Sequence, residues 1–260
     1  MAVHFGQRKL LLIETLYLID HANLSKNIVY IGAAPAVHIP YLAKLFPNNI
    51  FYLFDPKPYL IKESNQIIIK QEYFDSGSVT YLNGDFIIIS DIRSDINNKM
   101  TEKEIDLVIE NDMELQASWI KDLRPKSALL KFRLPKSQPT NTYQYLGGKL
   151  LTQPWAPIDT FESRLVWNGE PICEYNLFDY QNMMNDEKIQ RSRIIRHKIP
   201  LKRAHGLDYC YDCNREIDIW MKYLKFIKDE LTNTNIVNLI NKASNKTKKF
   251  LTKRPHGLFV

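Results

Sequence analysis

The sequence predicts an α/β fold with a doubly wound, mostly parallel β-sheet, and three observations lead to this prediction. Short apolar runs recur through the first half of the chain, as expected of strands buried on both faces. Stretches with helical spacing of apolar residues lie between several of these runs, which is typical of parallel sheets built from crossover units. A turn of small residues follows the first run, at the strand end where open α/β sheets bind cofactors.

The first predicted element is an amphipathic helix from Gln7 to about His21, where apolar residues recur with helical spacing. A short strand at Asn27 to Ala33 follows, and Pro35 then introduces a helix at Val37 to Phe46. Three more apolar runs predict buried strands, at Ile50 to Phe54, Gln66 to Lys70 and Asp85 to Ser90.

The next two elements are a long helix and a strand. The helix runs from Thr101 to Leu123, and Glu104, three residues after Thr101, is typical of a capping box. The strand is expected at Ala128 to Leu134. We therefore expect the first half of the chain to supply the parallel part of the sheet.

The second half of the chain predicts antiparallel strands and then helices. Arg164 to Trp167 and Ile172 to Tyr175 flank Asn168-Gly169, a pair suited to a tight hairpin turn, so we expect antiparallel edge strands there. C-terminal helices are expected at Tyr180 to His197, Glu216 to Leu231 and Asn235 to Lys253, the last of them a basic helix or frayed tail. We expect a single domain over residues 1–260, with a core at about 6–197 and a helical appendage at about 198–260.

The composition favours a polyanionic partner. The 35 Lys and Arg residues exceed the 29 Asp and Glu residues, which gives a formal net charge of +6. The three cysteines do not form a disulfide framework, which indicates a reducing compartment. No apolar run approaches the roughly 20 residues needed to span a bilayer, and the start lacks a signal pattern. We therefore expect a soluble intracellular protein without a membrane partner.

Two features point to a nucleoside-containing cofactor. Small residues between Tyr30 and His38, Gly32 and Ala36 among them, would let the backbone approach a ligand at the end of the first strand. Asp55 ends the second strand about 20 residues later, a spacing suited to hydrogen bonds with an adenosine ribose. Taken singly, the turn could reflect close packing and Asp55 could cap a loop, but together they favour the cofactor site.

Two charged residues lie at later strands. Asp91 follows the strand at Asp85 to Ser90, and Lys131 lies within the apolar strand at Ala128 to Leu134. A lysine in an apolar strand is costly to bury unless it has a partner or a task. The alternative interpretation is an outward-facing lysine on an edge strand.

At these positions the sequence resembles the viral cap-specific mRNA 2′-O-methyltransferases, most closely the poxvirus enzyme that also serves as the small subunit of poly(A) polymerase. The resemblance covers roughly Gly6 to His197, with looser similarity around Tyr209 to Leu224. The matching segments occur in the family's order, at Gly6 to Leu11, Val29 to Leu42, Ile89 to Ser94, Leu130 to Arg133 and Glu162 to Leu165.

The resemblance implies a Rossmann-like methyltransferase that uses S-adenosylmethionine to methylate the ribose of the first transcribed nucleotide of capped mRNA. The implied catalytic tetrad, present in full, is Lys9, Asp91, Lys131 and Glu162. The implied cofactor contacts are Gln7, Tyr30, Gly32, Ala36, His38, Asp55, Phe74 and Asp91. Family members commonly carry glycine where this chain has Ala36, which adds only a methyl group to the methionine pocket.

The implied chemistry is proton removal from a ribose hydroxyl held in line with an activated methyl group. Lys131 would be the general base, since partial desolvation and a neighbouring cation such as Lys9 can lower a lysine pKa towards neutrality. Asp91 and Glu162 would orient the two lysines. The cofactor brings the activated methyl group, so this chemistry requires no metal.

Substrate recognition departs from the pattern of the family. Arg133, Lys136 and Arg164 lie beside the implied site and could pair with RNA phosphates, or could be solvated surface charges. Lys136 and Gln181 stand where the poxvirus enzyme grips methylated guanine with an aromatic ring and a carboxylate. Either the substrate is not strictly a methylated cap or other aromatic residues hold it, the candidates being Tyr143, Tyr145 and Trp155.

Other functions remain open from the sequence. A ribosomal or transfer RNA 2′-O-methyltransferase shares the fold and the tetrad, and an RNA-binding subunit that stimulates polyadenylation is the alternative from another class. The expected partners are the 5′ end of capped mRNA and other capping or polyadenylation subunits, in the host cytoplasm or a virion. Cys210 and Cys213 supply two of the four ligands that a structural zinc needs, so we predict no metal site even with Cys173 and His205 elsewhere.

Overall fold

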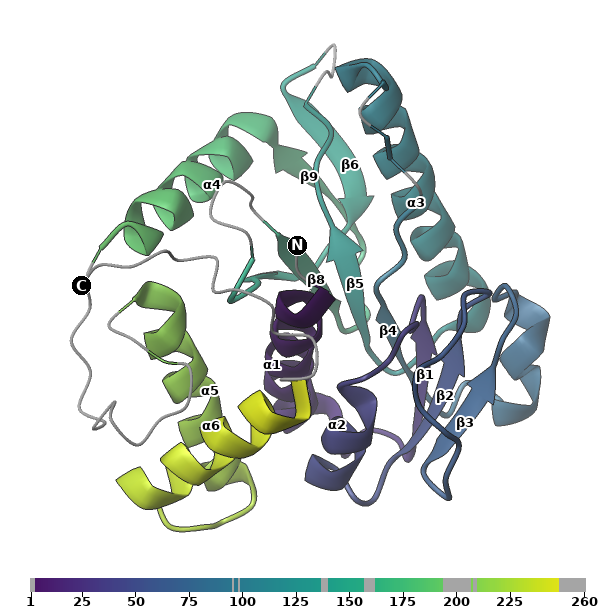
Figure 1. Ribbon diagram of the computed structural model, residues 1–260. Coiled ribbons are helices and arrows are strands. Elements are labelled where there is room, and N and C mark those ends of the chain that lie inside the picture. Colours follow the sequence, from purple (N-terminus) through teal and green to yellow (C-terminus); the bar gives the residue numbers. More distant parts are fainter. Residues whose placement is uncertain are drawn as a thin grey trace.

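The main β-sheet of the protein has seven strands, seen in a computed structural model that describes residues 3–94, 96–97, 99–136, 140–156, 162–193, 207 and 210–247 (Figure 1). Its strand order is β3-β2-β1-β4-β5-β8-β7. The strands are β1 (Asn27–Ile31), β2 (Ile50–Phe54), β3 (Ile67–Lys70), β4 (Ile87–Ser90), β5 (Ala128–Phe132), β7 (Lys149–Thr152) and β8 (Ser163–Trp167). A second sheet pairs β6 (Thr142–Leu146) with β9 (Ile172–Asn176).

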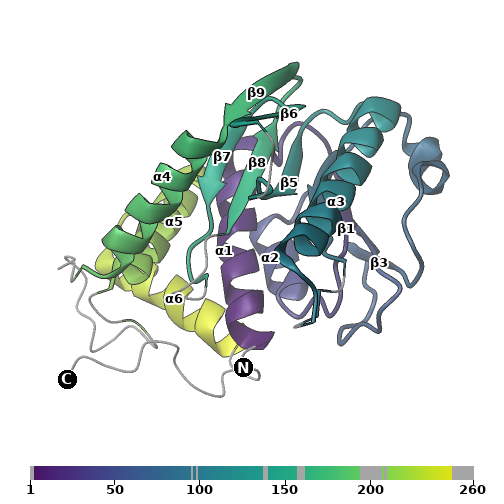
Figure 2. The same cartoon turned by 90° about the horizontal axis from the view of Figure 1, so that it is seen from above.

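Helices cover both faces of the main sheet (Figure 2). They are α1 (Val3–His21), α2 (Ile39–Leu45), α3 (Glu102–Leu123), α4 (Leu177–Arg191), α5 (Tyr211–Phe226) and α6 (Asn233–Thr247), with the 3₁₀ helix η1 at Ser76–Leu82. In β1, Ile28 and Tyr30 pack in a cluster with α1, α2, α5 and α6, whereas Val29 and Ile31 pack in a cluster with α3. Burial on both faces explains why these strands read as continuous apolar runs.

Strands β1 to β5 are all parallel to their neighbours in this set. The chain builds β2 and β3 on one side of β1, then returns to build β4 and β5 on the other side. The strand order therefore reverses between the neighbouring strands β1 and β4. Ligands of open α/β sheets bind at such points, at the carboxyl ends of the strands. The predicted doubly wound, mostly parallel sheet is confirmed.

The predicted antiparallel strands are present at one side of the main sheet, but β8 is not itself the edge strand. Strand β8 is antiparallel to β5 on one side and to β7 on the other, so it lies inside the sheet. Strand β7 forms the edge instead. Sequence analysis did not predict β6 or β7, which are short and lack a long apolar run.

The predicted hairpin between β8 and β9 is wrong, although Asn168-Gly169 does lie in a bend. Strand β9 pairs with β6 in the second sheet. The segment that joins β6 to β7 passes close to the end of β8 at Gly147 and Gly148. A Cβ on Gly148 would lie 2.3 Å from the carbonyl oxygen of Val166. This close approach requires glycine, and the strands on either side of it pair in different sheets.

The helix boundaries follow local capping. The predicted capping box is present at the start of α3, where Thr101 accepts from the backbone of Glu104 and Glu104 accepts from that of Thr101. Helix α5 begins at Tyr211, five residues before the predicted start, because Cys210 caps it through the backbone N–H of Cys213. No helix in the described ranges is both long and apolar enough to cross a membrane.

A buried ion pair joins α5 to α1. Arg8 Nε and Nη2 donate to the two carboxylate oxygens of Glu216 at 3.0 and 2.9 Å, and both residues are almost fully buried. The indole N–H of Trp155 donates to Glu216 Oε2 at 2.8 Å. Arg8 immediately precedes Lys9, so this contact fixes the turn of α1 that carries a predicted catalytic residue.

Candidate active site

A cavity of about 510 Å³ lies at the carboxyl ends of β1, β2, β4 and β5. It is the place that the reversal of strand order predicts. Five of the residues singled out in the sequence line it: Gly32, Asp55, Phe74, Asp91 and Lys131.

The turn after β1 brings the strand ends together. Gly32 has φ +77°, and a Cβ there would lie 2.9 Å from the backbone nitrogen of Ile92. Its own N–H donates to the carbonyl oxygen of Phe54 at 2.8 Å. Only glycine fits this close approach, which places the ends of β1, β2 and β4 around one cavity.

Asp55 holds two loops of the cavity wall. Its Oδ2 accepts from the backbone N–H of Ala34 at 3.0 Å, and its Oδ1 accepts from that of Lys57 at 2.8 Å. Each carboxylate oxygen has a further lone pair. Asp55 can therefore bind a ligand hydroxyl while it supports the loops on either side.

An aromatic wall stands beside Asp55. Phe74 packs edge-on against Phe54 and Trp119, with ring centroids 5.0 and 5.1 Å apart. Sequence analysis missed Trp119, which lies on α3 together with two other lining residues, Asp112 and Leu115. Their spacing of three and four residues places them on one helix face, a signal that could have indicated a shared role.

Four residues predicted to bind the cofactor do not line the cavity: Gln7, Tyr30, Ala36 and His38. All four are buried. Gln7 Oε1 lies 2.8 Å from His38 Nδ1, and His38 Nε2 lies 2.9 Å from a carboxylate oxygen of Glu14. Tyr30 donates its hydroxyl to the other oxygen of Glu14 at 2.6 Å. The structure directs these polar side chains to one another.

The predicted tetrad forms two ion pairs. Lys131 Nζ donates to Asp91 Oδ1 at 2.7 Å, and Lys9 Nζ pairs with both carboxylate oxygens of Glu162. The four side chains keep 16–23% of their surface exposed, enough for contact with a substrate. Burial raises the pKa of Glu162, but Lys9 outweighs it and holds this pKa below its ordinary value, with smaller contributions from Arg164 and Lys131.

Arg164 completes the cluster. Lys131 and Arg164 face each other across β5 and β8, and Arg164 Nη2 donates to Asp91 Oδ1 at 2.6 Å. Its Nε donates to Gln153 Oε1 at 3.0 Å, and its side chain is only 3% exposed. The two environments expected for Arg164 were an RNA phosphate contact and a solvated surface; its guanidinium is instead buried and engaged by protein groups.

The charges of the cluster shift its pKa values. Burial raises the pKa of Asp91, but Arg164 and Lys131 outweigh it and hold this pKa well below its ordinary value. Burial of Lys131 lowers its pKa to about 8, Asp91 opposes this, and Arg164 and Arg93 reinforce it. The cations that act on Lys131 are thus the two arginines rather than the predicted Lys9, which is paired with Glu162.

Gln116 on α3 fixes the backbone of Lys131. Its side-chain amide donates to the carbonyl oxygen of Lys131 at 2.9 Å and accepts from the N–H of Lys131 at 3.1 Å. Gln116 is 1% exposed, so these bonds are shielded from water. The lysine side chain therefore starts from a fixed point on β5.

The family described as poly(A) polymerase regulatory subunit matches residues 2–253, nearly the whole chain. The chain belongs to this family. The predicted membership is confirmed. The charged cluster of Lys9, Asp91, Lys131, Glu162 and Arg164 lies inside the matched region of the chain.

Named relatives of this family member include viral proteins. The cap-specific mRNA (nucleoside-2′-O-)-methyltransferases of Myxoma virus strains Lausanne and Uriarra are each 28% identical over 239 residues. These alignments cover 85% of this chain and 68% of each relative.

Solved structures give a weaker likeness. The RNA-capping protein VP4 of bluetongue virus has a TM-score of 0.48 at 17% identity, over 77% of this chain and 32% of that chain. A ribosomal RNA methyltransferase from Plasmodium falciparum has a TM-score of 0.38 at 17% identity, over 60% of this chain and 96% of that chain.

A second cavity, of about 270 Å³, is lined by two of the residues that the sequence suggested as RNA contacts. Arg133 and Lys136 line it together with Gln181. Lys136 is exposed and donates to Glu102 Oε1 at 3.0 Å, so a phosphate would compete with that carboxylate. Arg133 has no ion pair within the described residues, and its contact with RNA stays a prediction.

Two of the aromatic residues considered for cap binding are inaccessible. Tyr145 is 5% exposed and donates its hydroxyl to the carbonyl oxygen of Met113 at 2.8 Å. Trp155 is also 5% exposed, and its ring lies under the guanidinium of Arg8. Tyr143 is half-buried and remains a candidate.

The cysteine pair lies at the start of α5. Cys210 Sγ and Cys213 Sγ are 3.0 Å apart. Within the described residues no group of three or more His, Cys, Asp and Glu side chains could hold a metal ion, and His205 lies outside those residues.

Proposed function

We propose that this protein is an S-adenosylmethionine-dependent methyltransferase that acts on the ribose 2′-hydroxyl of the first transcribed nucleotide of capped mRNA. The observation that carries the proposal is the cluster of Lys131, Asp91 and Arg164 at the cavity edge, with the Lys9–Glu162 pair beside it. The relatives named as cap-specific mRNA 2′-O-methyltransferases support the same reaction.

The cavity fits the cofactor. Asp55 offers carboxylate lone pairs to ribose hydroxyls, and the aromatic wall at Phe74 and Trp119 offers an apolar surface to adenine. S-adenosylmethionine supplies a methyl group already activated for transfer, so the protein needs only to position the acceptor and remove its proton.

Lys131 is the group that removes the proton. A lysine must be neutral to act as a base, and burial brings the pKa of Lys131 to about 8, within reach of physiological pH. Arg164 shares Asp91 Oδ1 with Lys131, so Asp91 stays charged and the lysine stays oriented when it loses its own charge. Lys9 and Glu162 neutralise each other beside this pair and can orient the ribose.

The decisive experiment is a methyl-transfer assay on short RNAs that differ only in cap status. We expect a 2′-O-methyl group on the first nucleotide of the capped RNA, identified by nuclease digestion and mass spectrometry of the nucleosides. Equal methylation of uncapped RNA would favour the alternative, a ribosomal or transfer RNA methyltransferase. Absence of transfer to any RNA would contradict the proposal.

Replacing Asp55 by alanine should weaken cofactor binding by about 1 to 3 kcal/mol, the usual cost of leaving a hydrogen-bonding partner unsatisfied. Isothermal titration with S-adenosylmethionine measures this loss. Asp122→Ala removes the same charge from an exposed site on α3 and serves as the matched control. Equal affinities of the Asp55 variant and the wild type would remove Asp55 from the site.

RNA affinity should fall steeply as the salt concentration rises. In Arg133→Gln the slope of log K against log salt concentration should be smaller in magnitude by about one. The reason is that a phosphate contact releases a counterion. Fluorescence anisotropy at several salt concentrations measures both slopes. Lys126→Gln is the control, because Lys126 lies before β5 at the other end of the strand and pairs with Asp85. An unchanged slope for Arg133→Gln would mean that Arg133 makes no phosphate contact.

A second role in polyadenylation is proposed from the family description. The partner would be a poly(A) polymerase catalytic subunit or another capping subunit, in the host cytoplasm or the virion. The three cysteines are thiols rather than disulfides, which fits a reducing compartment. Addition of the protein to a poly(A) polymerase reaction should lengthen the tails, and unchanged tail length would limit the protein to methylation.

A further inference from the structure

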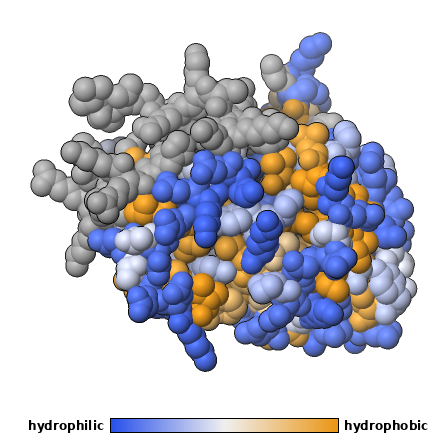
Figure 3. Space-filling view, turned by 60° about the horizontal axis from the view of Figure 1, so that its bottom comes forward, coloured by the Kyte–Doolittle hydropathy of each residue, from blue (hydrophilic) through white to orange (hydrophobic). Residues whose placement is uncertain are grey.

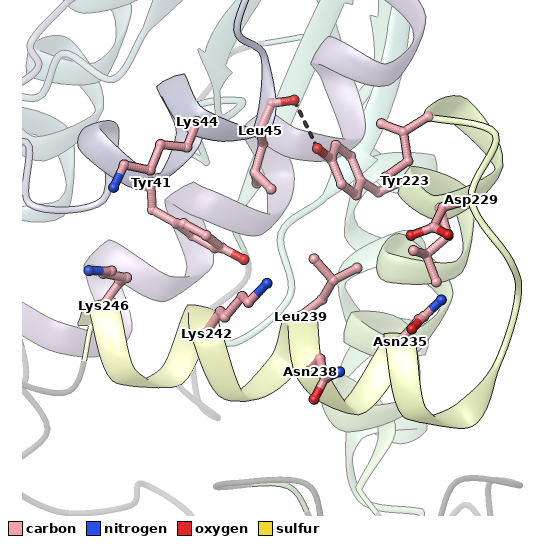
Figure 4. Close-up of a pocket in the computed structure, with 12 residues that line it drawn as sticks. Tyr41, Lys44, Leu45, Tyr223, Asp229, Asn235, Asn238, Leu239, Lys242 and Lys246 are labelled. Atoms are coloured by element: carbon pink, nitrogen blue, oxygen red, sulfur yellow. Dashed lines mark hydrogen bonds between the residues drawn. The ribbon is translucent and has the colours of Figure 1, made fainter.

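A cavity of about 530 Å³ lies between α2, α5 and α6 (Figure 4). It shares no lining residue with the cavity at the strand ends. Its size falls in the range of small-molecule sites, which are about 300–1,000 Å³. The methyl-transfer chemistry described above makes no use of it.

One end of this cavity is cationic. Lys242 and Lys246 lie one turn apart on α6, and Lys44 faces them from α2 (Figure 4). None of the three has an ion-pair partner within the described part of the chain. Like charges at this spacing repel one another, so a bound anion would be favoured there.

Tyr41 adds an unused donor at the same end. The residue is 6% exposed, and its hydroxyl has no hydrogen-bond partner among the described residues. Figure 4 shows this hydroxyl pointing into the cavity towards Lys242. The neighbouring Tyr223 differs, because its hydroxyl donates to the carbonyl oxygen of Leu45 at 2.9 Å. A buried hydroxyl without a partner is unfavourable, and an acceptor on a ligand would satisfy it.

The other end of the cavity carries neutral and acidic hydrogen-bonding groups. Asn235 and Asp229 lie there, separated from the cationic end by the apolar side chain of Leu239, and Asn238 also lines the cavity (Figure 4). Amide and carboxylate groups suit the hydroxyls of a ribose or the edge of a base. The cavity is thus polarised, with cations at one end, an apolar middle and hydrogen-bonding groups at the other end.

We propose that this cavity is a second nucleotide-binding site, distinct from the methyl-transfer site. The phosphates would bind Lys44, Lys242, Lys246 and the Tyr41 hydroxyl, since lysine binds phosphate as a point charge. The nucleoside would lie across Leu239 towards Asn235 and Asp229. On the face that brings the lower side of Figure 1 forward, hydrophilic and hydrophobic side chains alternate over the surface (Figure 3). The nucleotide could be free or part of an RNA chain.

Binding of ATP and of a short uncapped RNA with a 5′-hydroxyl tests the proposal. Titrations use the full chain saturated with S-adenosylhomocysteine, which blocks the cavity at the strand ends. Lys242→Gln/Lys246→Gln should weaken binding at least about tenfold, because two charge-assisted contacts are lost. Lys222→Gln/Lys225→Gln removes the same charge from exposed positions on α5 outside the cavity and should leave affinity unchanged.

Tyr41→Phe provides a variant that should fold, since it deletes only an unpartnered hydroxyl. It should weaken binding about two- to tenfold, the worth of one hydrogen bond. ATP binding would identify a free nucleotide as the ligand, and binding of the RNA alone would identify a nucleotide within a chain. The proposal would be overturned by no saturable binding of either probe, by equal losses in the two double variants, or by equal affinity for ATP and inorganic tripolyphosphate.

Discussion

Replacement of Lys131 by methionine is expected to lower the rate of methyl transfer by about 10²- to 10⁴-fold, the usual contribution of a general base. Methionine keeps much of the length of the lysine side chain but cannot accept a proton. Cofactor affinity should change little, because Asp55 and the aromatic wall stay in place. Single-turnover assays measure the rate, and calorimetry measures the affinity.

The pH dependence provides an independent check on Lys131. Its pKa of about 8 means that the neutral form is scarce below pH 8 and predominates above it. The wild-type rate should therefore rise with pH through about 8 and then level off, whereas the residual rate of Lys131→Met should lack this rise. Lys131→Arg should also be inactive, since a guanidinium stays protonated. Substantial activity in Lys131→Arg would make Lys131 an electrostatic anchor rather than the base.

Glu216→Ala should lower the free energy of unfolding by about 3 to 5 kcal/mol, the cost of breaking a buried ion pair. The variant leaves Arg8 charged at a site where only 2% of its surface is exposed. Trp155 and Trp220 lose the acceptor of their indole N–H groups as well. Urea denaturation followed by circular dichroism measures the loss.

Two further variants separate this ion pair from other effects at Glu216. Glu230→Ala removes an exposed carboxylate from the α5–α6 connection and should change stability by less than about 0.5 kcal/mol. Arg8→Met/Glu216→Leu removes both charges together and should recover much of the stability, because no unpaired charge remains in the interior. A double variant no more stable than Glu216→Ala would assign the loss to packing.

The parallel sheet and the meeting of Asp91 and Lys131 at one cavity could be predicted because they depend on local signals. Lys9 and Glu162 came only from the family resemblance. Strands buried on both faces are continuous apolar runs, and the carboxyl ends of parallel strands meet at one edge of the sheet. Asp91 and Lys131 therefore had to lie near the turn at Gly32, before any contact was known.

The role of Arg164 could not be predicted because it depends on strand pairing. The sequence around Arg164 suggested an exposed basic residue beside a hairpin turn, where it could contact RNA. In the fold, β8 lies between β5 and β7, so Arg164 is set opposite Lys131 and next to Asp91. No local pattern shows which distant strand will become a neighbour.

The buried network at Gln7, His38 and Glu14 illustrates the same limit. Family resemblance marked Gln7 and His38 as cofactor contacts, but sequence alone does not show that two polar residues will bond to each other. Their hydrogen bonds join α1 to the turn before α2. The residues support the cavity from the protein interior, because they hold the elements that enclose it.

The ion pair between Arg8 and Glu216 also bears on where this protein can be divided. A fragment ending near residue 197 would keep all four tetrad residues, yet it would lack the carboxylate that neutralises Arg8. Lys9 is the next residue on the same helical turn, so a change in the position of Arg8 would also move Lys9. We therefore expect a fragment that ends before α5 to be destabilised at the start of α1, next to the proposed catalytic lysine.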